Sequence, residues 1–307
     1  MKKQVRITLL LGILALLVQS RAEAQQEAQI TQYLDNMLYY NPAYAGSTDR
    51  LSMAALSRIQ WAGIEGAPRT HVFAGHSPLN YESLALGASI MNDAVGPLSQ
   101  TWLNIDASYT LRFENHKGRL AFGLKGGLNF INGELSSVPT TQANDPAFMV
   151  NYSNEIRPNI GAGIYYHSEQ FFAGASVPRM LSNSDPQLVE YNDQQHYYFT
   201  TGGYFELNRA WKLRPSAMLK MTTNAPIALD LSTAAIFYDQ IWLGVNYRLQ
   251  DSFGVLFQYQ FQNQFRVGYA YDFATTSMVR NNIGTHEIMI TYDLYFKKGR
   301  VFGPRYF

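Results

Sequence analysis

The stretch "FGVLFQYQF", residues 253–261, places aromatic or β-branched side chains on one face and Gly, Leu and Gln on the other. Successive side chains of a β-strand point to opposite faces, so this alternation predicts a strand with one apolar face. The same pattern recurs in "QFRVGYAYDF" (264–273), "IWLGVNYRLQ" (241–250) and "TWLNIDASYTLRF" (101–113). The chain is therefore predicted to be an all-β protein.

Alternation alone does not separate a soluble β-sandwich from a membrane barrel, but the composition does. Aromatic residues make up 14% of the chain and charged residues only 15%, against about a quarter in soluble domains. Tyr and Phe gather toward strand ends, as the aromatic girdles of a transmembrane β-barrel do. The sequence therefore favours an antiparallel barrel of the outer-membrane type. Four charges on the polar strand faces are then predicted to line a wet lumen: Asp230, Arg248, Arg266 and Asp272.

The number of strands and the lengths of their connections support a barrel rather than a sandwich. We predict about 14 strands between residues 51 and 296, an even number as in bacterial single-chain barrels. The long connections, 132–156, 178–195 and 274–283, all follow odd-numbered strands, whereas short turns follow even-numbered ones. This sorting predicts short turns and both termini in the periplasm and long loops outside the cell. Residues 297–307 are a C-terminal tail. The long loops are either simply solvated or a surface for a protein partner.

The first 24 residues have the pattern of a secretory signal peptide. A basic head precedes an apolar run at 7–18, and Ala22-Glu23-Ala24 offers small residues for a cleavage near Ala24. The run is too short for a spanning helix, although a retained membrane anchor is the alternative. The predicted location is the outer membrane of a Gram-negative cell, with outer-membrane lipid as a partner.

Catalytic and cofactor signatures are missing from the sequence. The mature chain keeps 20 basic and 22 acidic residues, a net charge of −2, which argues against a nucleic-acid partner. It has no cysteine, no G-x-S-x-G and no H-E-x-x-H, and its six histidines are scattered. His286-Glu287 is interpreted as a polar pair at a strand end, and "GLKGGLNF" (123–130) as strand glycines that ease close packing. We therefore predict no enzyme activity, no cofactor and no metal.

The segment before the first strand is unusually aromatic. "QITQYLDNMLYYNPAYAGS" (29–47) holds four tyrosines besides Leu and Met, whereas a free leader should be polar. We predict that residues 25–50 form an N-terminal periplasmic, plug-like unit that is tucked into the barrel mouth or packed against its rim. Asn41-Pro42 and Gly46 supply bends. The alternative is a mere first turn of the barrel.

This same stretch, followed by "SRIQWAGIEGAPRTHVFAGHSPL" (57–79), resembles the amino-terminal signature of the PorP/SprF family of the type IX secretion and gliding machinery of Bacteroidota. Further matches follow in order at 86–97, 157–166, 172–181, 284–294 and 303–307. The family-like positions, which the resemblance marks as candidate motif or interaction residues, are Tyr33, Asn41, Pro42, Tyr44, Gly46, Gln60, Trp61 and Pro68.

The resemblance implies an outer-membrane barrel that helps secrete or anchor surface adhesins through protein–protein interaction, together with other type IX secretion components and the adhesin cargo. Composition and spacing do not imply this role, because a fold supports many functions. The alternative function is an outer-membrane channel or porin for small solutes. Bilayer conductance of the pure protein separates the two.

Overall fold

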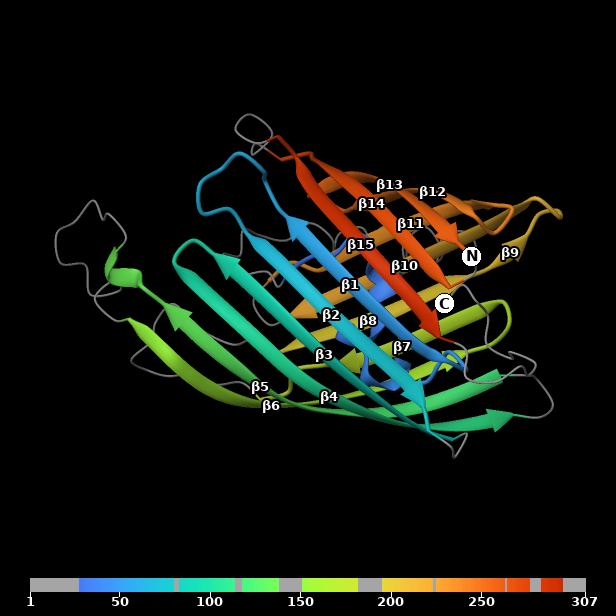
Figure 1. The fold of residues 1–307 in the computed structure, drawn as a ribbon, viewed down its shortest axis with the longest axis horizontal. Coiled ribbons are helices and arrows are strands. Elements are labelled where there is room, and N and C mark those ends of the chain that lie inside the picture. Colours follow the sequence, from blue (N-terminus) through green and yellow to red (C-terminus); the bar gives the residue numbers. More distant parts are fainter. Residues whose placement is uncertain are drawn as a thin grey trace, which may run out of the picture.

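The computed structural model describes residues 28–79, 83–113, 118–137, 151–181, 195–222, 225–262, 264–276 and 283–294. In these residues an antiparallel wall of strands surrounds a short helical segment (Figure 1). The strands are β1 (Leu51–Ile59), β2 (Arg69–Pro78), β3 (Leu84–Val95), β4 (Leu98–Phe113), β5 (Gly118–Gly133), β6 (Tyr152–His167), β7 (Phe171–Val177), β8 (His196–Gly203), β9 (Phe205–Glu206), β10 (Trp211–Thr222), β11 (Ala228–Phe237), β12 (Ile241–Arg248), β13 (Ser252–Phe261), β14 (Phe265–Ala274) and β15 (Thr285–Leu294).

The wall closes on itself. Each strand except β8 pairs with the next one along the chain, and β15 returns to pair with β1, with Leu51 opposite Leu294. Strands β8 and β9 both pair with β10, at Gly202↔Ser216 and Phe205↔Leu213, so they are two parts of one wall strand. The described residues therefore form a closed barrel of 14 wall strands, and the predicted fold class is confirmed.

Apolar side chains cover the outside of the barrel. Ile105 and Leu124 are 68% and 69% exposed, while Asp106 and Lys125, each one position further along, are buried on the inside. Such an outer surface is stable in lipid, because exposing it to water forgoes the free energy of burying each side chain. The alternation that identified the strands thus separates a lipid-facing side from a polar interior.

The two ends of the barrel differ in their connections. We call the end where β1 begins and β15 ends the proximal end, and the opposite one the distal end. By the bounds of the strands, the connections 60–68, 134–151, 178–195 and 275–284 all leave from the distal end. Strand β6 begins at Tyr152, five residues before where the end of the predicted connection 132–156 would place it. Asn154 has a positive φ of 51°, and the pairing of β6 with β5 shifts in register between Ile131 and Gly133. The first residues of β6 therefore lack the regular alternation by which the other strands were predicted. The predicted signal peptide (1–24) and tail (297–307), and most of each of the three predicted long loops, lie outside the described residues.

Three short helical turns precede β1: η1 (Tyr33–Asn36), α2 (Met37–Tyr40) and η2 (Pro42–Tyr44). Residues of α2 and η2 contact β2 to β6 from the inside, and the dark-blue turns lie within the ring of strands in Figure 1. No helix among the described residues is both long and apolar enough to cross a membrane.

Candidate functional site: the segment inside the lumen

Residues 28–50, here called the lumen segment, run along the inside of the barrel. Near its start, Thr31 bonds to Asp272 and Glu287, which stand on the distal parts of β14 and β15. Near its end, Arg50 pairs with Asp293, the penultimate residue of β15, at the proximal end. The lumen segment therefore crosses much of the lumen from the distal half to the proximal end, where it continues into β1.

Local sequence explains why the lumen segment folds into tight turns. The Asn41 side chain accepts a bond of 2.9 Å from the Ala43 backbone N–H, and Pro42 occupies the first position of η2. An N-cap side chain and a proline at this position both favour a helical turn, since the proline has no N–H to leave unsatisfied. Gly46 has a φ of 73°, a left-handed conformation that glycine adopts without strain. The chain can therefore turn away from η2 toward β1.

Large apolar side chains of the lumen segment form the core of the barrel interior. Tyr33, Met37, Leu38 and Tyr40 are at most 2% exposed. They join a single cluster with wall residues from many strands, which include Met91, Trp102, Tyr165, Phe172, Tyr198, Met218, Trp242 and Met289. Burial of each such side chain contributes about 1.5–3 kcal/mol, so the lumen segment is a packed part of the protein.

A charged cluster holds the start of the lumen segment. Glu287 accepts the backbone N–H groups of Thr31 at 2.9 Å and Gln32 at 2.8 Å. Arg58 lies between the carboxylates of Glu287 and Asp272, at 3.1 and 2.9 Å, and Glu287 and Asp272 are almost fully buried. Because the arginine balances two carboxylates on neighbouring strands, this cluster belongs to the wall and anchors the segment through its main chain.

Asp35 is the central charge of the lumen segment. Its carboxylate lies 2.6 Å from the Arg266 guanidinium and 3.4 Å from that of Arg214, and it accepts a bond of 2.9 Å from Gln258. Both arginines stack on the Trp242 ring, 4.5 and 4.6 Å from its centroid. Burial alone would raise the pKa of Asp35, but the two guanidinium groups and the Gln258 amide hold that pKa below its ordinary value. Asp35 is therefore charged when bound.

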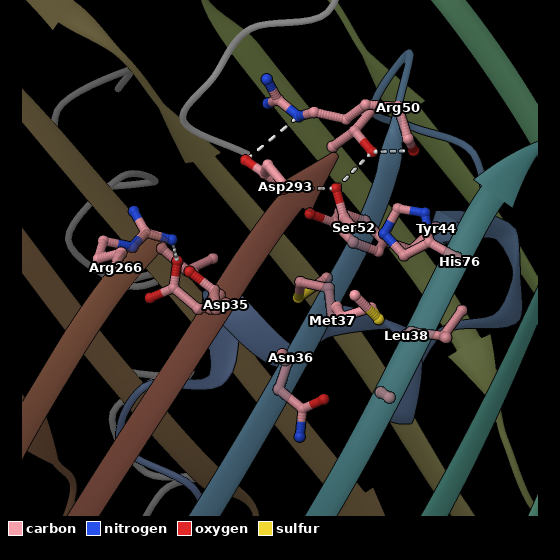
Figure 2. A pocket seen from close by; sticks show the side chains of 16 residues that line it. Asp35, Asn36, Met37, Leu38, Tyr44, Arg50, Ser52, His76, Arg266 and Asp293 are labelled. Carbon is pink, nitrogen blue, oxygen red and sulfur yellow. Dashed lines mark hydrogen bonds and ion pairs between the residues drawn. The ribbon is translucent and has the colours of Figure 1, made fainter. Parts of the chain in front are cut away.

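A second set of ion pairs and a small cavity lie near the proximal end. Asp49 pairs with Arg119 at 2.8 Å, and Arg50 with Asp293 at 3.3 Å. Figure 2 shows Arg50, Asp293 and Ser52 on one side of a cavity of about 60 Å³, lined by both polar and apolar side chains, and Asp35 with Arg266 on the other. The lumen segment thus leaves little room between itself and the wall here.

The wall also contacts the main chain of the lumen segment. Lys125 donates to the carbonyl of Leu38, Ser176 to that of Tyr40, and Ser108 to that of Ala45. These bonds come from side chains. Among the described residues, no backbone–backbone hydrogen bond joins the lumen segment to a wall strand. The segment is therefore held by side chains and is not an additional strand of the sheet.

Glycines of the wall allow close approach of the lumen segment. A Cβ at Gly123 on β5 would overlap the backbone of Pro42 and Ala43, and one at Gly163 on β6 would overlap the Asn41 side chain. A Cβ at Gly126 would meet nothing within 4 Å. The glycines of "GLKGGLNF", which were interpreted as strand glycines that ease close packing, thus include one that the bound segment requires.

The predicted motif residues lie in two separate places. Tyr33, Asn41, Pro42, Tyr44 and Gly46 all belong to the lumen segment: the Tyr33 hydroxyl bonds to Ser216 at 2.8 Å, and the Asn41 amide donates to the Ile164 carbonyl at 2.9 Å.

The other three motif residues stand in the turn between β1 and β2, at the distal end. The Gln60 N–H donates to the Pro68 carbonyl at 2.9 Å, and Trp61, with a φ of 49°, donates its N–H to Thr285. The structure therefore does not bring these three together with the five in the lumen segment.

The four predicted lumen charges lie on the inner face. Asp230 pairs with Arg248 at 2.7 Å and with Lys220 at 2.8 Å, while Arg266 and Asp272 belong to the contacts described above. We interpreted His286-Glu287 as a polar pair at a strand end, but the Glu287 side chain is buried on the inner face. Only His286 faces outward, bonded to the Tyr269 hydroxyl at 2.7 Å. Sequence reasoning also missed Asp35, whose signal was a lone acid in an aromatic segment.

The described residues hold no group of three or more His, Cys, Asp or Glu side chains that could bind a metal ion. The geometry offers instead a barrel whose interior is filled by its own N-terminal segment. The contacts that hold it are buried ion pairs, hydrogen bonds and aromatic packing.

Comparisons with solved structures find other outer-membrane barrels at low identity. The outer membrane protein Omp33 of Acinetobacter baumannii is 9% identical, with a TM-score of 0.46 over 81% of this chain and 100% of that one. A TodX deltaS2S3 mutant, a monoaromatic hydrocarbon channel, is 10% identical, with a TM-score of 0.48 over 85% and 94%. The KdgM porin in complex with disordered oligogalacturonate is 8% identical, with a TM-score of 0.38 over 80% and 99%.

A search of curated protein sequences finds no match. The family model for the type IX secretion system membrane protein PorP/SprF matches residues 22–292, which is most of the chain. The protein therefore belongs to the PorP/SprF family of type IX secretion system membrane proteins.

Proposed function

We propose that this barrel helps secrete or anchor surface adhesins by protein–protein interaction, and that its lumen segment closes the lumen in the resting state. Family membership supports the secretion context. The observation that carries the closed state is the burial of the lumen segment: Tyr33, Met37 and Tyr40 are at most 1% exposed inside the wall.

A diffusive porin needs a continuous wet path, and the lumen segment obstructs one. At the distal side Glu287 holds its main chain, and toward the proximal side Asp35 binds two arginines and Asp49 pairs with Arg119. These attachments make spontaneous loss of the segment unfavourable, above all at Asp35, because displacement would take its carboxylate away from two buried arginines.

We further propose the orientation in which the proximal end faces the periplasm and the distal end faces outward. The long connections leave from the distal end, as in outer-membrane barrels. In this orientation, adhesin cargo and the other secretion components contact opposite ends of the same barrel. Residues 25–50 form the plug-like unit in this proposal, and its motif residues act through packing rather than catalysis.

The matched glycines of β5 provide the test of the closed state. Gly123→Ala should push Ala43 away from the wall, whereas Gly126→Ala meets open space and serves as the control. In planar bilayers, the wild-type and Gly126→Ala proteins should stay closed, while Gly123→Ala and a deletion of 29–46 should conduct. Heat-modified mobility in detergent verifies that each barrel is inserted and folded.

The adhesin role needs a second assay on cells that carry these same variants. We expect Gly123→Ala and the deletion to reduce the amount of surface adhesin that is secreted or retained, and Gly126→Ala to leave it unchanged. A co-purified adhesin or secretion component from native outer membrane would support the role directly. Normal adhesin display by an inserted, conducting deletion variant would contradict the role of the segment.

The alternative function, a channel for small solutes, is favoured by one observation. Side chains alone hold the lumen segment, so the segment can leave without breaking the sheet. Steady conductance of the wild-type protein, equal to that of the deletion variant, would support the channel and contradict the closed barrel.

A further inference from the structure

We propose that the inner wall holds an acidic polypeptide segment when the lumen segment is displaced, and that Asp35 and Asp49 occupy the carboxylate sites of that polypeptide in the closed state. The proposal rests on the proposed function only in treating the lumen segment as displaceable.

The wall supplies cations and the lumen segment supplies carboxylates at two sites. Arg214 and Arg266 bind Asp35, and Arg119 binds Asp49 through two bonds of 2.8 and 3.2 Å. If the segment leaves, each of these arginines loses that carboxylate. At the distal cluster, Glu287 and Asp272 keep Arg58 as a partner on the wall whether or not the segment is present.

The paired site is built to hold a carboxylate in a fixed place. Trp242 is 2% exposed and carries both guanidinium groups on its ring. As a result, Arg214 and Arg266 converge on the same oxygen of Asp35. Arginines that are stacked on an aromatic ring lose little further freedom when they bind a carboxylate, and their planar donors suit that group. The site therefore stays preorganised for another carboxylate.

The three arginines gather toward one end of the barrel. Arg119 and Arg266 are second in β5 and β14, and Arg214 is fourth in β10; these positions lie on the proximal side. They stand on separate parts of the wall, with β6 to β9 between β5 and β10 and β11 to β13 between β10 and β14. Displacement of the segment would therefore leave three arginines on the proximal side of the inner wall, where Asp293 would also lose its ion pair with Arg50.

Other donors on the wall indicate that the occupant is a polypeptide and not a small anion. Lys125, Ser176 and Ser108 bind the main-chain carbonyls of Leu38, Tyr40 and Ala45. Any polypeptide offers such carbonyls whatever its side chains, whereas a small carboxylate offers none. Together, the carbonyl donors and the arginine sites are complementary to a chain with acidic residues.

The test uses full-length protein and a fluorescent 12-residue peptide of alternating Gly and Glu, with a Gly and Lys peptide as the charge control. Asp35→Asn with Asp49→Asn removes both internal carboxylates while leaving the chain complete. In detergent, we expect the acidic peptide to bind this variant at least about tenfold more tightly than it binds the wild type. The basic peptide should bind neither protein. The deletion of 29–46 should bind the acidic peptide at least as well.

When Arg214→Gln and Arg266→Gln are added to this variant, its binding of the acidic peptide should weaken by about tenfold or more. Heat-modified mobility verifies that the protein is folded. Lys212→Gln is the matched control, because Lys212 forms its ion pairs with Asp239 on the neighbouring turn and Glu206 on β9. Unchanged peptide binding after loss of both arginines would overturn the proposal. If free glutamate at the same carboxylate concentration competed equally well with the acidic peptide, the site would bind small anions, and the proposal of a polypeptide occupant would be overturned.

The same measurements separate this inference from the proposed function. Peptide binding that depends on the arginines, in a barrel whose variants display adhesin normally, would support the acidic-segment site and contradict the secretion role of the lumen segment. Loss of adhesin display in variants that bind no peptide would support the secretion role of the lumen segment and contradict the acidic-segment site.

Discussion

Substitution of Asp35 by Asn should open the barrel more than any other single change in the lumen segment. The side chains of Asp35 and Arg214 are each 4% exposed and that of Arg266 is 11% exposed, so the three charges are nearly shielded from water. Removing one partner of a buried ion pair costs about 3–5 kcal/mol, because the opposite charge stays buried without compensation. At about 1.4 kcal/mol per tenfold, the displaced population should rise by roughly 10²-fold or more.

Asp49→Asn is the matched control for this prediction. Its ion pair with Arg119 is less buried, with side chains that are 25% and 11% exposed, and an ion pair in contact with water contributes about 1 kcal/mol or less. The open probability of single barrels in planar bilayers should therefore rise less than about tenfold. Equal open probabilities for wild type, Asp35→Asn and Asp49→Asn would refute the view that Asp35 holds the segment.

Three further predictions follow from the same geometry. Leu124→Arg, on the lipid face at 69% exposure, should destabilise the barrel by about 2–4 kcal/mol if it lies near the membrane midplane, measured by urea unfolding in lipid vesicles; an unchanged midpoint would contradict the lipid-facing assignment. In a chain that has no native cysteine, a lipid-phase reagent should label a cysteine at Tyr269 but not at Gly268 or Ala270, since Tyr269 is 41% exposed and Ala270 is 1% exposed; the reverse pattern would show that the faces are exchanged. Asp35 holds the segment fully above the unfolded carboxyl pKa of about 4, and this contribution is lost as pH falls through the lowered pKa of the bound state. The open probability of the barrel should therefore stay level between about pH 5 and pH 8 and rise only in stronger acid. A rise near pH 6 would point to another group.

The sequence by itself determined the wall of this protein. Residues 253–261 alternate with a period of two, and the structure has a strand over Ser252–Phe261 with alternate residues exposed. Such local patterns are sufficient because a barrel strand needs only one apolar and one polar face, and its hydrogen-bond partners are its neighbours along the chain. The start of β6 was misplaced because the positive φ at Asn154 and the shift in register near Ile131 leave no periodic signal.

Only the tertiary structure decided how the interior is filled. Composition could show that residues 29–47 are too aromatic for a free leader, but several docking places remained open. Asp35 lies 231 positions from Arg266 and 179 from Arg214, and Thr31 lies 256 positions from Glu287. Contacts over such separations depend on barrel closure, which brings β10, β14 and β15 around one axis, and no local period records them. For this reason the motif residues could be named from the sequence, while their division between the lumen segment and the distal turn required the folded barrel.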